Sequence, residues 1–118
     1  MFGCGGNRDN KKRPIMGAIA EKYSDFCFVT TDNPRFENPD LIAEDILDGM
    51  KNKDVVVVEN DRKKAIMLAL EKLDKNTIVA VCGKGGEKYQ DINGVMSPFN
   101  DVTIVKDCLK ELGFKILK

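Results

Sequence analysis

The sequence contains no histidine. His-based general base catalysis and Ser-His-Asp triads are therefore excluded. The four cysteines, Cys4, Cys27, Cys82 and Cys108, form no CxxC pair, so the spacing predicts no zinc site and no other metal site. Cys27 and Cys82 lie in apolar, strand-like runs, and we expect both to be buried thiols.

The chain also has no net charge and no long apolar run. With 19 basic and 19 acidic residues, the chain does not match nucleic-acid or anionic-membrane proteins whose affinity comes from bulk charge. No apolar run approaches the roughly 20 residues that span a bilayer. The N-terminus lacks the apolar core of a signal peptide. We therefore expect a cytoplasmic protein.

The 118 residues include 42 % hydrophobic side chains, which suffices for one small domain. Helical spacing of apolar residues predicts helices over 14–23, 39–50 and 61–73. Strands are expected over 26–30, 77–82 and 55–58, the last being four consecutive valines that predict burial on both faces. This alternation implies parallel βαβ units, that is, an α/β fold with a mostly parallel sheet flanked by helices.

The C-terminal third follows another pattern. A short strand over 89–92 turns at Asn93-Gly94, a strong hairpin signal. Asn100 or Asp101 can cap a last helix that ends near Gly113, and the tail over 114–118 could add a short strand. At the other end, Met1–Gly6 resembles the end of a strand running into a turn. We expect the chain to be cut inside that strand and to expose an apolar backbone edge.

The segment Thr31–Arg35 follows the strand over 26–30 and concentrates polar chemistry. In open α/β sheets, ligands collect at the carboxyl ends of strands. Asp32 can pair an ammonium, Arg35 can clamp a carboxylate, and Pro34 fixes the backbone between them. The alternative is a polar turn with a surface ion pair.

Two glycine-rich turns, over 3–8 and 83–88, invite a nucleotide-binding interpretation, but neither fits a standard motif. The alternative is a pair of tight turns. The basic cluster over 8–13 lies just before a helix N-terminus, a position that phosphates favour; the alternative is a solvated loop.

Three polar loops, over 3–13, 31–38 and 83–87, each follow a predicted strand. Because parallel strands end at one edge of a sheet, these loops can line a single cleft. Its side chains would be Arg8, Asp32, Asn33, Arg35, Lys84 and Glu87. This set suits a ligand with both ammonium and carboxylate groups, although chance convergence of ordinary loops is the alternative.

The motifs in these loops resemble the C-terminal domain of the Mur ligases over nearly the whole chain. They are Gly3-Cys4-Gly5-Gly6-Asn7-Arg8-Asp9 with Lys12-Arg13-Pro14, then Asp32-Asn33-Pro34-Arg35, and finally Gly83-Lys84-Gly85-Gly86-Glu87 with Tyr89-Gln90. The resemblance implies a Rossmann-like domain in peptidoglycan synthesis. Members of the family join an amino acid to a UDP-linked peptide by amide formation, in which ATP phosphorylates the acceptor carboxylate.

The Asp-Asn-Pro-Arg form resembles that of members that add meso-diaminopimelate to UDP-N-acetylmuramoyl-L-Ala-D-Glu. The resemblance implies that this amino acid is bound by Arg8, Asp32, Asn33, Pro34, Arg35, Gly83 and Glu87. Arg35 would pair the distal carboxylate that lysine does not have. The resemblance also implies that Asp9, Lys12 and Arg13 face ATP.

The chain departs from the family in two ways. Gly86 stands where the family usually has histidine. The N-terminal UDP-binding domain and the central ATPase domain, which would hold most of ATP and Mg, are absent, so 1–118 is expected to be a C-terminal domain that is inactive alone. Lysine- or lanthionine-adding ligases, or a free-standing small-molecule binding module, are the alternatives.

Overall fold

The computed structural model describes residues 1–116. β1 (Cys27–Val29) pairs in parallel with β2 (Val56–Val58). On the other side of β1, the Phe2 N–H donates to Phe28 O (3.0 Å) and the Thr30 N–H donates to Phe2 O (2.9 Å). Met1 in turn pairs with the segment over 80–82. The spatial order is therefore β2, β1, residues 1–2, residues 80–82, and the mostly parallel sheet of an α/β fold is confirmed.

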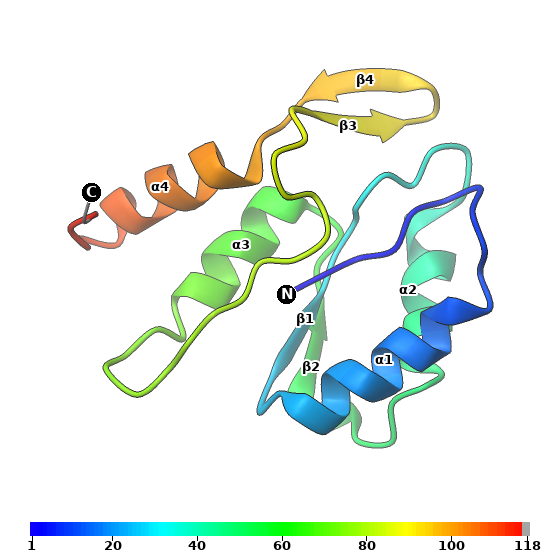
Figure 1. Ribbon diagram of the computed structural model, residues 1–118, viewed down its shortest axis with the longest axis horizontal. Helices are drawn as coiled ribbons and strands as arrows, with labels where there is room; N and C mark the ends of the chain where they lie inside the picture. The colour runs from blue at the N-terminus through cyan, green and yellow to red at the C-terminus, as the bar shows by residue number, and fades with distance from the viewer. Residues whose placement is uncertain (117–118) are drawn as a thin grey trace.

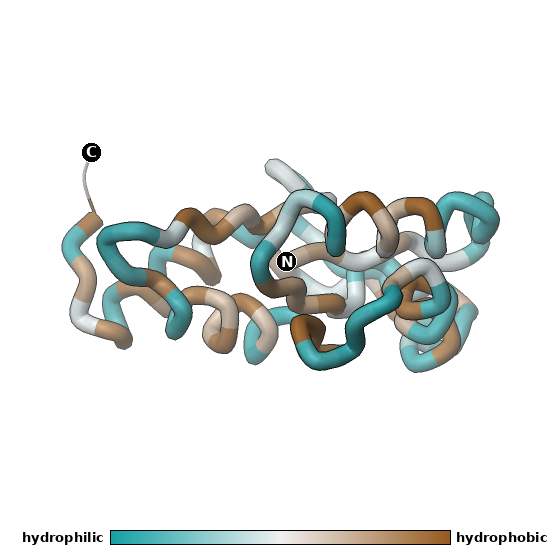
Figure 2. The backbone as a smooth tube through the Cα atoms, turned by 90° about the horizontal axis from the view of Figure 1, so that it is seen from below, coloured by the Kyte–Doolittle hydropathy of each residue, from teal (hydrophilic) through white to brown (hydrophobic). Residues whose placement is uncertain are grey.

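Helices cover both faces of this sheet (Figure 1). α1 (Lys12–Tyr23) and α2 (Pro39–Leu47) pack on each other on one side, and α3 (Arg62–Leu70) and α4 (Asp101–Glu111) on the other. The layers form a flat slab with extents of 39 × 34 × 18 Å (Figure 2). Each of these helices begins within two residues of its predicted start. The helices α2 and α3 end about three residues before their predicted ends.

Three helices begin where the sequence offers a capping side chain. Asn38 accepts from the Asp40 N–H, Asp61 from the Lys64 N–H, and Asn100 from the Thr103 N–H. Each side-chain oxygen satisfies a backbone donor that has no partner within its helix. Local chemistry thus places α2, α3 and α4 along the chain.

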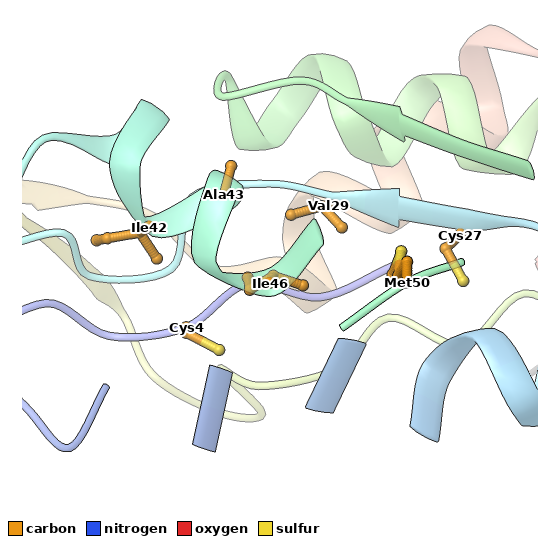
Figure 3. Close-up of a cluster of buried hydrophobic side chains, with 7 residues drawn as sticks. All are labelled: Cys4, Cys27, Val29, Ile42, Ala43, Ile46 and Met50. Carbon is orange, nitrogen blue, oxygen red and sulfur yellow. The ribbon is translucent and has the colours of Figure 1, made fainter. Parts of the chain in front are cut away.

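The larger core lies between β1, α2 with the turn that follows it, and the first of the three polar loops (residues 3–13, the first loop). Seven buried side chains from these segments gather there (Figure 3): Cys4, Cys27, Val29, Ile42, Ala43, Ile46 and Met50. A second core joins α3 to α4 around Ile66, Leu70 and Cys108. The first loop is therefore held by its own buried cysteine, and this fixes where the following residues leave the sheet.

In the C-terminal third of the chain, β3 (Tyr89–Ile92) and β4 (Val95–Pro98) form an antiparallel hairpin, as predicted. Its turn residues Asn93 and Gly94 both have positive φ, at 53° and 79°, which is the geometry that an Asn-Gly turn favours. The hairpin lies beyond the carboxyl end of β1, at the top of Figure 1. It therefore sits over the edge of the sheet where the polar loops emerge.

Three expectations were wrong. The valines of β2 are not buried on both faces, since Val57 and Val58 are 37 % and 40 % exposed; β2 is an edge strand that pairs with β1 alone among the described residues. Residues 77–82 do not form a regular strand, because the backbone hydrogen bonds of Ala80 and Cys82 join them to the single residue Met1. Cys82 at the end of this segment is exposed.

Three further observations concern the C-terminal tail, the segment before β2 and membranes. Residues 114–116 add no strand, and the rest of the predicted tail strand lies outside the described residues. A short 3-10 helix, η1 (Lys53–Val55), precedes β2. Across residues 1–116, no helix combines the length and the apolar character needed to cross a membrane.

Candidate functional site

The three polar loops meet at the carboxyl edge of the sheet. The Gly6 N–H donates to Asn33 O (2.8 Å), and a Cβ on Gly6 would lie 1.9 Å from Pro34 O. A Cβ on Gly83, whose φ is +113°, would lie 2.8 Å from Asp32 Oδ2. Two of the glycines thus allow backbone to approach the Asp32–Arg35 segment from either side. The structure brings together the loops that sequence topology predicted to converge.

The side chains of Arg8 and Arg35, from two different loops, both lie beside Gly5. Arg35 Nη1 donates to Gly6 O at 2.8 Å and lies 2.9 Å from where a Cβ on Gly5 would stand. The Cγ atom of Arg8 is 3.7 Å from that same point. Within residues 1–116, Arg8 is exposed and has no ion-pair partner. Two arginine side chains therefore flank one glycine, and guanidinium groups pair well with carboxylates.

The backbone of Arg35 is held by the hairpin. Its N–H donates to Asp91 O (3.0 Å), and its carbonyl accepts from the Asn93 N–H (2.7 Å). Arg35 has a φ of +51°, which an L-residue adopts at a cost unless its surroundings impose it. The pairing with β3 supplies that constraint, so the hairpin determines the direction in which the Arg35 side chain leaves the loop.

Lys84 lies at the centre of the remaining polar residues. Its ammonium donates to Asn33 Oδ1 (2.8 Å) and to Tyr89 O (3.1 Å). It also lies 3.4 Å from Asp32 Oδ1 and 3.8 Å from Glu87 Oε1. The expected partner of Asp32 was an ammonium group of a ligand. In the structure Lys84 occupies that position, so Glu87 is the carboxylate that stays exposed.

Arg62 and Asp101 form an ion pair directly beneath these loops. Two donors of Arg62 meet the two carboxylate oxygens of Asp101 at 2.8 and 2.7 Å. The same guanidinium donates to Thr31 O and Cys82 O, both at 3.1 Å. Since these carbonyls lie just after β1 and at the end of the 80–82 segment, the pair fixes the spacing of the two loops that follow. Nothing local in the sequence marks it, because its members lie 39 residues apart.

The residues expected to face ATP divide into two groups. Asp9 and Lys12 are exposed at the start of α1. Arg13 is 2 % exposed and donates to Gly5 O, Glu37 and Asp45. The hydrogen bond from Arg13 holds the pKa of the Glu37 carboxyl below its ordinary value, and the Asn7 N–H lowers it further. In this structure Arg13 holds the first loop and is withdrawn from the surface.

One hollow, of about 330 Å³, borders the convergent loops, where Thr31, Pro34 and Gln90 line it. Another, of about 430 Å³, opens at the opposite edge of the sheet, beside Met1, where Phe26, Phe28 and Ile78 line it. Ile78 is 94 % exposed there. Arg8, Asn33, Arg35 and Glu87 line neither of these two hollows.

Comparison with known proteins identifies the family of the chain and agrees with the α/β fold described above. Residues 1–85 match the family described as Mur ligase, glutamate ligase domain. The chain belongs to that Mur ligase family. Its Rossmann-like fold is that of a solved structure titled UDP-N-acetylmuramoyl-L-alanyl-D-glutamate--2,6-diaminopimelate ligase. The match has a TM-score of 0.89 at 37 % identity and covers 97 % of this chain and 24 % of that one.

Curated relatives of this Mur ligase domain carry the same ligase name. The one from Aquifex aeolicus is 54 % identical over 109 residues, which cover 92 % of this chain and 23 % of the relative. The one from Clostridioides difficile is 47 % identical over 113 residues, covering 95 % and 23 %. The chain thus spans about a quarter of the length of the relatives that it matches.

Proposed function

We propose that this chain is the amino-acid-binding domain of an ATP-dependent ligase that adds meso-diaminopimelate to UDP-N-acetylmuramoyl-L-Ala-D-Glu. The observation that carries the proposal is the meeting of Arg8, Arg35, Asn33 and Glu87 at one edge of the sheet. The shared name of the relatives supports it.

The side chains suit the two charged groups at one end of diaminopimelate. Arg35 and Arg8 offer several N–H donors for the distal carboxylate, and Asn33 Nδ2 adds another. Glu87 Oε1 lies 3.2 Å from Asn33 Nδ2, so an acceptor for the neighbouring ammonium stands next to a donor for the carboxylate. Asp32, Pro34 and Gly83 shape the loops that carry these groups. Lysine lacks the distal carboxylate and leaves both arginines without that partner.

The proposed role of this chain is recognition and orientation. UDP-binding and ATPase domains of the longer ligase would supply the acceptor peptide and the ATP that activates its carboxylate. Lys12, exposed at the N-terminus of α1, fits a position facing the ATP phosphates, and the exposed Asp9 fits one facing the ribose hydroxyl groups. The buried Arg13 fits neither position. In this proposal magnesium is held with ATP, mainly by the ATPase domain.

Substrate binding tests this proposal directly. The chain is titrated with meso-diaminopimelate, lanthionine and lysine, and the same amino acids are assayed with a chimera in which it replaces the matching quarter of the Aquifex aeolicus ligase. We expect diaminopimelate to be preferred. Arg35→Ala should weaken its binding by about 2–5 kcal/mol and bring its affinity close to that of lysine.

Lys88→Ala serves as the matched control, because Lys88 is an exposed cation outside the set of proposed ligands. Wild-type affinity of Arg35→Ala for diaminopimelate would remove Arg35 from the site. Preference for lanthionine or lysine in the chimera would change the proposed substrate. Failure of the chimera with every amino acid, together with tight binding of another small molecule, would favour a free-standing binding module.

A further inference from the structure

Lys84 is a buried cation inside an exposed loop. Its side chain is 0 % exposed, although Gly83, Gly85 and Gly86 around it are all exposed. Lysine is almost never fully buried unless its charge is paired. Its burial therefore points to a specific task at this position, and a ligand on the surface would not reach its ammonium.

The ammonium of Lys84 determines how Asn33 is oriented. Asn33 Oδ1 accepts from Lys84 Nζ at 2.8 Å and from the Asp91 N–H at 3.0 Å. Both lone pairs of the amide oxygen are then used. The amide nitrogen is left to point toward Glu87 Oε1, 3.2 Å away. Asn33 accordingly presents hydrogen-bond donors, and no acceptor, to the surface.

The same ammonium also brings two carboxylates together. Asp32 Oδ1 and Glu87 Oε1 lie 3.4 and 3.8 Å from it, and they belong to different loops. Without a cation between them, the like charges would repel each other and separate the loops. One buried side chain thus contacts three of the residues in the proposed binding site.

We propose that Lys84 is a positioning residue for the amino-acid site: it fixes Asn33 as a donor and holds Glu87 beside it without touching the ligand. This inference rests on the proposed function, because it concerns the same ligand. Loss of Lys84 leaves the Asp91 N–H as the one described donor to the Asn33 amide oxygen. The amide can then turn this oxygen toward the ligand carboxylate, and the two acceptors would repel each other.

The test compares Lys84→Met and Lys84→Gln with the control Lys88→Met, four residues away on the exposed part of the loop. Glutamine keeps a donor for Asn33 Oδ1 but removes the charge. Binding of meso-diaminopimelate is measured on the 118-residue chain, and its KM is measured in the Aquifex aeolicus chimera. NMR of the ligand-free chain follows the side-chain amide of Asn33 and the backbone amide of Asp91.

We expect Lys84→Met to weaken diaminopimelate binding by about 10- to 100-fold, the loss of a charge-assisted hydrogen bond, and Lys84→Gln to lie between it and wild type. In the chimera the diaminopimelate KM should rise while the ATP KM stays within about twofold. The Asn33 and Asp91 resonances should shift in the ligand-free methionine variant, and Lys88→Met should match wild type in every measurement.

Wild-type binding by Lys84→Met with unmoved Asn33 resonances would overturn the inference, and so would an equal loss in Lys88→Met. If Lys84→Met does not fold, Lys84→Gln decides by the same criteria. The two proposals can also be separated. If the wild-type chain does not bind diaminopimelate and the chimera does not use it, while the Asn33 resonances still depend on Lys84, the proposed function fails and the role of Lys84 in orienting Asn33 stands.

Discussion

Replacing Asp101 by asparagine should be among the most destabilising changes of a single polar group in this domain. The Asp101 side chain is 6 % exposed and that of Arg62 is 0 % exposed. The asparagine side chain would keep one acceptor for Arg62 but would place an NH2 group against a guanidinium donor. It would also leave the guanidinium charge buried with only the Thr31 and Cys82 carbonyls as further partners.

The expected cost follows from this burial. Removing one member of a buried ion pair costs about 3–5 kcal/mol, because the remaining charge is uncompensated. Domains of this kind are stable by about 5–15 kcal/mol in total. For a chain of this size, about 4 °C of melting temperature corresponds to 1 kcal/mol, so the midpoint should fall by about 12–20 °C.

Urea denaturation monitored by circular dichroism measures this loss as a shift of the midpoint at constant slope. Asp107→Asn is the matched control, since Asp107 is exposed on the same helix and its change should stay within about 0.5 kcal/mol. The double variant Arg62→Met, Asp101→Leu should lose less than Asp101→Asn, because no lone charge remains buried. A loss below about 1 kcal/mol in Asp101→Asn would refute the argument.

Three shorter predictions concern other parts of the domain. Cys82 is the exposed cysteine, so a thiol reagent should label one site per native chain quickly, and rapid labelling of all four would contradict the buried positions of the others. Gly6→Ala should cost about 2 kcal/mol by overpacking against Pro34 O, whereas Gly86→Ala, with open space around it, should be near neutral by urea denaturation; equal losses would contradict this. The pKa of the Glu37 carboxyl is lowered in the folded chain, so this group stabilises the fold above its ordinary pKa of 4.5, and the stabilisation is lost as the pH falls through the lower folded pKa. The difference in unfolding free energy between wild type and Glu37→Gln should therefore shrink in that acid range. A difference that stays constant with pH would exclude this effect.

Much of the fold could be predicted from local signals. Asn38, Asp61 and Asn100 mark helix starts because a short polar side chain satisfies the first free N–H groups. Asn93 and Gly94 mark the hairpin because the turn needs two residues that tolerate positive φ. These effects act within a few residues, so a short stretch of sequence is enough to reveal them.

The candidate site was predicted in part, through topology. Strand ends in a parallel sheet share one edge, so the loops carrying Arg8, Arg35 and Glu87 could be expected to meet. The partner of Asp32 could not be predicted in the same way. A lysine in a glycine-rich loop looks solvated in a sequence, and only the packing of the hairpin against Asn33 buries Lys84.

Residue order alone was enough to show where the helices and turns begin, and which loops carry charge. It was not enough to show that β2 is an exposed edge, that Arg13 is withdrawn from the surface, or that Arg62 joins Asp101 across 39 residues. These features became visible only in three dimensions. Burial and ion pairing depend on which segments become neighbours in space, and that depends on the whole set of long-range contacts, which no local pattern of residues encodes.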